Sequence, residues 1–168
     1  MSTINTLTDL YKESLKDIYN ANKQSKAATE KLHGAAHSPE LKKALEAGVQ
    51  GIQKGIDALD KIADKHGFKP TGKVCKGMEG LVTEAEEHGI KASYGDGDVQ
   101  DAMIIQQYQR MVHYALVGYG SLLAYAKRLG LDEDAKILQK CLDDTYDGDR
   151  HMTEIATGSG GINAEAAA

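Results

Sequence analysis

The chain has 168 residues, a length that suits one domain and can bury an apolar core without disulfides or structural metal. Its formal net charge of -5 and sequence pI of about 5.7 make nucleic acid and anionic membrane surfaces poor partners, because both require a basic patch. No segment approaches the ~20 apolar residues that cross a bilayer, and the first residues form no basic or apolar leader, so we expect a soluble, cytoplasmic protein.

The first half of the chain predicts two long helices. Apolar residues recur at three- and four-residue spacing from Leu7 and predict a helix that ends near Gly34. In residues 38–40 the serine can cap a helix, the proline suits its first turn and the glutamate complements the helix dipole. A second helix is therefore expected from Pro39 to a stop at residues 66–67. Its predicted buried stripe is Leu41, Leu45, Ile52, Ile56, Leu59 and Ile62.

The second half predicts one short helix and two more long ones. The short helix is expected over residues 73–88, and turn formers at 93–98 mark a loop in which Asp98 can cap the next helix. That fourth helix runs to Gly130, and a fifth begins at residues 131–133, whose carboxylates favour a helix N-terminus. The residues expected to face inward from the short helix are Val74, Met78, Leu81 and Val82.

These elements together predict the fold class. No turn-bounded alternating run predicts a strand, and four helices of roughly 25 to 30 residues with one additional short helix in the middle connection predict an all-α four-helix bundle. We expect this bundle to span residues 1–157. Small and polar residues predict a flexible C-terminal tail over residues 158–168.

Glycines inside the predicted helices are unusual, because each costs about 1 kcal/mol relative to alanine. Gly48, Gly51 and Gly55 recur at three- and four-residue spacing in the second helix, and Gly118 and Gly120 interrupt the fourth. Either close approach of helices, within the bundle or across a dimer, or a cavity for a small ligand would offset that cost. We favour close packing.

Cysteines and tyrosines are interpreted as structural. Cys75 and Cys141 lie far apart without metal-binding or redox spacing, so we expect small buried side chains rather than a disulfide or reactive thiols. The eight tyrosines are expected to pack with their hydroxyls hydrogen-bonded or in water rather than to carry electrons. Two pairs eleven residues apart share a helix face, Tyr108 with Tyr119 and Tyr114 with Tyr125.

Several short motifs occur in order along nearly the whole chain and resemble the YciE/YciF-like proteins of the ferritin superfamily. They are Leu10-Tyr11, Asn22-Lys23-Gln24, residues 75–85, residues 99–102, His113-Tyr114, residues 119–122 and residues 135–138. The resemblance implies a ferritin-like four-helix bundle, usually a homodimer, that is associated with bacterial stress responses. It also implies a dinuclear metal site between the long helices.

The resemblance further implies where the metal ligands should lie, and most of those positions hold other residues. The family has glutamate where this chain has Asn22, and its second-helix acidic patch corresponds to residues 47–51, Ala-Gly-Val-Gln-Gly. The glutamates expected beside His113 correspond to Val112 and Ala115. A dinuclear site of this kind needs about four carboxylates and two histidines, so these replacements predict a degenerate or lost centre.

Four residues remain as candidate metal-site remnants: Glu79, His113, Asp144 and Asp149. If they converge, mutual hydrogen bonds or ion pairs in a satisfied polar core are favoured over a residual mononuclear site. The alignment of the second helix has no firm anchor, and a shift of a few residues would bring Glu46 into the site.

Two functions from different classes follow. The first is a non-enzymatic, stress-associated bundle that acts as a homodimer or larger homo-oligomer through structural or binding interactions, with no cofactor expected. The alternative is a di-iron or di-manganese protein with oxidase, peroxide-scavenging or iron-binding activity. No nucleophile elbow, phosphate-binding loop, dinucleotide fingerprint or HExxH motif points to other chemistry, and the interpretation leans toward a non-enzyme.

Overall fold

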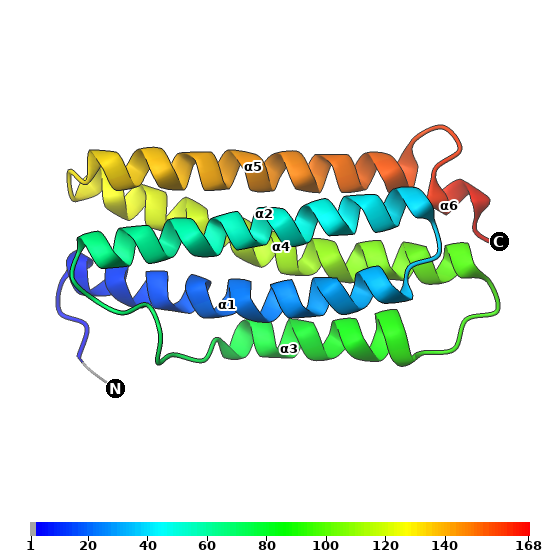
Figure 1. Ribbon diagram of the computed structural model, residues 1–168, viewed down its shortest axis with the longest axis horizontal. Helices are drawn as coiled ribbons and strands as arrows, with labels where there is room; N and C mark the ends of the chain where they lie inside the picture. The colour runs from blue at the N-terminus through cyan, green and yellow to red at the C-terminus, as the bar shows by residue number, and fades with distance from the viewer. Residues whose placement is uncertain (1–2) are drawn as a thin grey trace.

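The computed structural model describes residues 3–168 and consists of long helices packed side by side with a shorter helix against them (Figure 1). The long helices are α1 (Leu7–Ala35), α2 (Pro39–Lys65), α4 (Gly97–Arg128) and α5 (Asp132–Thr157). The shorter elements are α3 (Lys76–Glu84), the π-helical segment η1 (Ala85–Lys91) and α6 (Ile162–Glu165).

Within residues 3–168 there is no strand, and no helix combines the length and apolar character needed to cross a membrane. The predicted all-α bundle with a short helix in its middle connection is confirmed. The first two residues of the predicted domain, 1–157, lie outside the described residues.

The four long helices form a bundle in which each packs against two others. The helix α1 contacts α2 and α4, and α5 contacts α4 and α2. The α2–α5 pair packs less extensively than the α1–α2 and α4–α5 pairs. The short α3 and η1 run along the outside of the bundle against α1 and α4 (Figure 1). The seam between α2 and α5 is therefore not covered by the middle connection.

Side-chain caps explain where two of the long helices begin. The Ser38 hydroxyl accepts a hydrogen bond from the Leu41 N–H at 3.3 Å, so α2 begins as predicted. At α4 the cap is Asp96, whose carboxylate accepts from the Val99 N–H at 2.9 Å. The prediction that Asp98 caps this helix was wrong, because Asp96 has the extended backbone that a cap requires and Asp98 already lies in the first turn.

The short helix α3 begins later than predicted because Cys75 is tied to α1. The Cys75 N–H donates to Asn20 Oδ1 at 2.8 Å, and its carbonyl accepts from Gln24 Nε2 at 3.1 Å. These bonds hold the chain before Lys76 in an extended conformation. Val74 lies in this extended segment and is 57% exposed, so the prediction that it faces inward was wrong.

The apolar core consists of two clusters, one toward each end of the bundle. The cluster near the α1–α2 connection includes Leu32, Leu41, Leu45, Met78, Ile104 and Met111. The cluster at the opposite end includes Tyr11, Leu15, Leu59, Leu122 and Leu138. The middle of the bundle, between these clusters, has small residues on α2 in place of large apolar side chains.

The predicted tail, residues 158–168, contains the short helix α6. The chain turns back after α5, and α6 packs against α4 and α5 with Ile162 buried in the nearby apolar cluster (Figure 1). Burial of this side chain ties part of the segment to the bundle. The flexibility expected for the tail stays a prediction.

Candidate functional site

A pocket of about 620 Å³ lies in the middle of the bundle, between the two apolar clusters. All four long helices contribute to its walls. The lining residues that are exposed to solvent all belong to α2 and α5, including Gly51 and Lys54 on α2 and Lys140 and Asp144 on α5. The mouth of the pocket therefore opens along the seam where these two helices pack least extensively.

The sequence of α2 explains why the pocket exists. Five small residues repeat at four- and three-residue spacing on one face of the helix, and all of them line the pocket: Ala44, Gly48, Gly51, Gly55 and Ala58. Leu41 and Leu45 fill the core before this stretch, and Leu59 and Ile62 fill it afterwards. Small side chains leave the middle of the bundle unfilled. The glycine repeat seen in the sequence is the central part of this pattern of small residues, and Ala44 and Ala58 extend the pattern at either end.

The helix glycines of α2 serve close packing at two positions and leave open space at a third. A methyl group at Gly48 would lie 2.5 Å from the Tyr108 hydroxyl oxygen, and one at Gly55 would overlap the Tyr119 hydroxyl. These two glycines allow close packing of a tyrosine from α4 against α2. At Gly51 an added methyl group would meet nothing within 4 Å, so this glycine leaves open space in the pocket.

Few polar groups face the pocket from its inner walls. Asn22 is buried, and its Nδ2 donates a hydrogen bond to the Tyr119 hydroxyl oxygen at 2.7 Å. The hydroxyls of Ser25 and Thr29, on the same face of α1, donate hydrogen bonds to backbone carbonyls of their own helix. Tyr108 is 5% exposed, and its hydroxyl donates to no residue within 3–168. The pocket interior is therefore mostly apolar with uncharged polar groups.

The residues at the implied metal-ligand positions do not fit a dinuclear centre. Asn22, Gly48, Val112 and Ala115 all line this pocket, and none of them carries a carboxylate. The lining contains one carboxylate, Asp144, where a pair of divalent ions would need about four to neutralise their charge. The geometry also places Gly48, rather than Glu46, on the pocket wall, because Glu46 is exposed and absent from the lining.

Two of the four candidate remnants are separate surface ion pairs. Glu79 is exposed on α3 and bonds to Lys76 Nζ at 2.6 Å. Asp144 is exposed at the pocket mouth and bonds to Lys140 Nζ at 2.8 Å. Both pairs join residues three or four apart on one helix, the usual geometry of a solvated helix face. The structure does not bring either carboxylate to the other candidate residues.

His113 and Asp149 are the two remnants that meet. His113 Nε2 lies 2.9 Å from Asp149 Oδ2, across the seam between α4 and α5. The Gln109 amide donates to Asp149 Oδ1 at 3.0 Å and to the Thr153 hydroxyl at 2.8 Å. The His113 side chain is 62% exposed. This pair is a partly exposed polar contact between two helices, so the buried polar core expected if all four remnants converged does not form.

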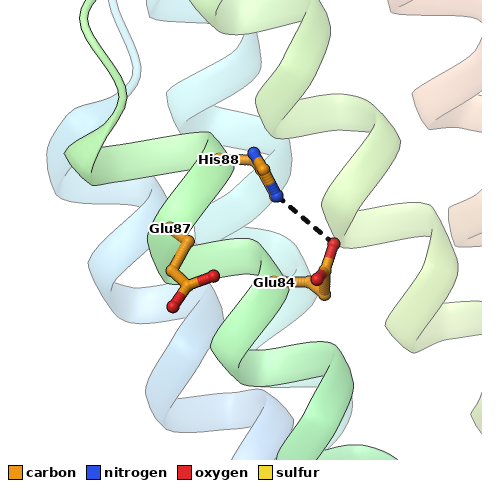
Figure 2. Close-up of side chains that lie close together, drawn as sticks. All are labelled: Glu84, Glu87 and His88. Atoms are coloured by element: carbon orange, nitrogen blue, oxygen red, sulfur yellow. Dashed lines mark ion pairs between the residues drawn. The ribbon is translucent and has the colours of Figure 1, made fainter.

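A different cluster of possible metal ligands lies on the outer surface. Figure 2 shows Glu84, Glu87 and His88 at the junction of α3 and η1, with His88 Nε2 3.4 Å from Glu84 Oε2. All three side chains are exposed, and Arg110 Nη1 lies 3.8 Å from the same Glu84 oxygen. The positive charge of this guanidinium would compete with a cation for the Glu84 carboxylate. We interpret Glu84 as the centre of a surface ion-pair contact with His88 and Arg110 rather than as part of a metal site.

The cysteines and Tyr114 have structural environments. Cys75 is buried, with its Sγ 2.9 Å from the Tyr114 hydroxyl, which donates to Asp17 Oδ2 at 2.8 Å. Cys141 is half-buried in the pocket wall, and burial raises the pKa of its thiol to about 11. A thiol with a raised pKa is protonated at neutral pH and reacts slowly. The expectation of unreactive, unpaired cysteines is consistent with both environments.

Comparison with known proteins agrees with the architecture. The family described as "Domain of unknown function (DUF892)" matches residues 6–167. Protein YciF of Escherichia coli strain K12 is 30% identical over 161 residues, which cover 95% of this chain and 96% of that protein.

Solved structures of two relatives have the same bundle. The crystal structure of the Escherichia coli stress protein YciF has a TM-score of 0.85 at 30% identity and covers 91% of this chain and 96% of that chain. YcfI from Rhodopseudomonas palustris has a TM-score of 0.85 at 32% identity and covers 92% of this chain and 97% of that chain. The chain therefore belongs to the DUF892 family and has the ferritin-like fold of YciF.

Proposed function

We propose that this protein is a metal-free, stress-associated member of its family that acts in the cytoplasm as a structural or interaction homo-oligomer. One observation carries the proposal: Asn22, Gly48, Val112 and Ala115, which stand at implied metal-ligand positions, line a mostly apolar pocket. The stress association is supported by the likeness to YciF, which is described as a stress protein.

The chemistry of the pocket wall supports the absence of a metal-dependent reaction. Two divalent cations stripped of water require several anionic oxygen ligands to offset the lost hydration. Asn22 and the two tyrosines at the wall offer neutral oxygens, and Asp144 is already paired with Lys140 at the mouth. A non-enzymatic role is therefore favoured over the di-iron or di-manganese alternative.

Metal analysis tests this proposal directly. We expect protein purified from iron- and manganese-supplemented cells to contain well below one metal ion per chain by elemental mass spectrometry. About two ions per chain would establish the dinuclear alternative instead. Ions held only at the surface should disappear in Glu87→Gln, which removes a carboxylate from the cluster in Figure 2 and leaves the pocket intact.

The oligomeric state is tested by sedimentation velocity over a range of protein concentrations. We expect a mass of at least twice the 18.1 kDa of one chain. A single-chain mass at every concentration would contradict the homo-oligomer and would leave the proposal on metal content unaffected.

A further inference from the structure

The Tyr108 hydroxyl is a polar group of the pocket wall that has no hydrogen-bond partner among residues 3–168. Within residues 3–168, every fully enclosed side-chain nitrogen or oxygen has a hydrogen-bond partner. The Tyr108 hydroxyl has none, although the residue is 5% exposed, so this oxygen must lie on accessible surface. Because Tyr108 lines the pocket and its hydroxyl packs beside Gly48, another lining residue, that accessible surface faces the pocket. A buried donor aimed into a cavity indicates a ligand that accepts its hydrogen bond.

The shape and lining of the pocket suit an apolar molecule. Its volume of about 620 Å³ falls within the range typical of small-molecule sites, about 300 to 1,000 Å³. Tyr108 and Tyr119 are eleven residues apart on α4, which corresponds to about 16 Å of helix. The wall between them contains Met111, Val112 and Ala115, all apolar. Most of a bound molecule would therefore contact hydrocarbon.

The charges around Tyr108 favour a neutral ligand oxygen. Burial, together with the carboxylate of Asp149, raises the pKa of Tyr108 to about 12. The hydroxyl is thus protonated at neutral pH and can donate a hydrogen bond. A negatively charged ligand group beside it would be repelled by Asp149 and would lose its hydration against the apolar wall, whereas the lysines of the lining, Lys54, Lys136 and Lys140, are exposed residues of α2 and α5. A hydroxyl or carbonyl oxygen avoids both costs.

We propose that the central pocket binds a small, mostly apolar, neutral organic molecule whose hydroxyl or carbonyl oxygen accepts a hydrogen bond from Tyr108. The molecule enters along the seam between α2 and α5, past Gly51. This inference rests on the proposed absence of a dinuclear centre, because two metal ions with their ligands would occupy the same space. Metal content measures the proposed absence of a dinuclear centre, and probe binding measures the proposed ligand site, so each proposal can be contradicted separately.

Two probes of the same ring size test the hydrogen bond. Naphthalene and 2-naphthol differ by one hydroxyl, and both are uncharged at pH 7. Equilibrium dialysis with the full chain is expected to give one 2-naphthol per pocket, with an affinity about five- to tenfold higher than that of naphthalene, the usual effect of one hydrogen bond. In Tyr108→Phe the affinity for 2-naphthol should fall to that of naphthalene, and naphthalene binding should not change.

Matched glycine variants test the location of the site. Gly51 and Gly80 are both helical and exposed, and an added methyl group at either would meet nothing within 4 Å, but only Gly51 lines the pocket. Gly51→Leu places a side chain in the pocket mouth and should lower the affinity for both probes at least tenfold. Gly80→Leu should bind like the unaltered chain. The thermal midpoints of both variants should not decrease, because leucine is a better helix former than glycine, so lost binding would not reflect unfolding.

An unchanged affinity of Tyr108→Phe for 2-naphthol would overturn the proposal, and so would any of three further results. The first is no binding of either probe by the unaltered chain, and the second is equal binding by Gly51→Leu, which would place the probe elsewhere. The third is tighter binding of 2-naphthoate than of 2-naphthol, which would show that the site selects an anion.

Discussion

Replacing Asp101 with alanine is expected to lower the free energy of unfolding by about 3 kcal/mol, because two backbone N–H groups lose their charged acceptor. Asp101 lies on α4 and has no exposed surface. Its carboxylate accepts from the His37 N–H at 2.8 Å and from the Ser38 N–H at 2.6 Å, in the connection between α1 and α2. Alanine removes both hydrogen bonds, and a hydrogen bond to a charged group contributes about 1.5 to 3 kcal/mol.

Urea unfolding followed by circular dichroism measures this effect. The free energy of unfolding of Asp101→Asn should lie between those of the unaltered chain and Asp101→Ala, because the asparagine amide oxygen can still accept one of the two hydrogen bonds. Asp147→Ala is the control, since Asp147 is exposed and, among residues 3–168, pairs only with Arg150 on the same helix. A loss of stability in Asp101→Ala no larger than in this control would contradict the role assigned to Asp101.

Replacing Asp134 with alanine is expected to lower the free energy of unfolding by about 1 to 3 kcal/mol, the usual cost of leaving a buried polar group without its hydrogen-bond partner. Asp134 has no exposed surface, although it lies in the first turn of α5. It accepts from the Tyr11 hydroxyl at 3.1 Å, lies 2.5 Å from His66 Nε2, and lies 3.3 Å from Lys65 Nζ. Its removal leaves the hydroxyl of the buried Tyr11 without an acceptor.

The neighbouring residue provides a matched control for this prediction. Glu133 binds the same Lys65 ammonium at 2.6 Å, but its side chain is 77% exposed. Because solvent screens such a pair, Glu133→Ala should leave the unfolding midpoint close to that of the unaltered chain. Equal destabilisation by the two substitutions in the same denaturation experiment would show that burial of Asp134 is not what makes its contacts important.

Features that depend on nearby residues could be predicted from the sequence. Apolar periodicity identified four long helices and the short one, and the cap at Ser38 placed the start of α2. The same reasoning failed at Val74, because hydrogen bonds from Cys75 to α1 keep the preceding chain extended. The residues missing from the implied metal site could also be named, since they are identities at matched positions.

The candidate site depended on contacts between residues distant in the chain. The repeat of Gly48, Gly51 and Gly55 was visible, but its meaning depended on where the tyrosines of α4 project. Two of these glycines receive a tyrosine hydroxyl and the third faces open space, a distinction that spacing along α2 cannot make. The unpartnered hydroxyl of Tyr108 likewise becomes visible only when its surroundings on all four helices are known.

The sequence by itself determined the helical class of this protein and the order of its helices, and its resemblance to a known family supplied the prediction of a degenerate or lost dinuclear centre. These follow from backbone propensity, apolar periodicity and the identity of single residues, all of which act locally. Tertiary structure alone decided that Glu79 and Asp144 lie apart, that Asp101 and Asp134 are buried, and that the middle of the bundle is a pocket. The physical reason is that burial and packing depend on side chains that meet across helices, and those meetings are set by the fold as a whole.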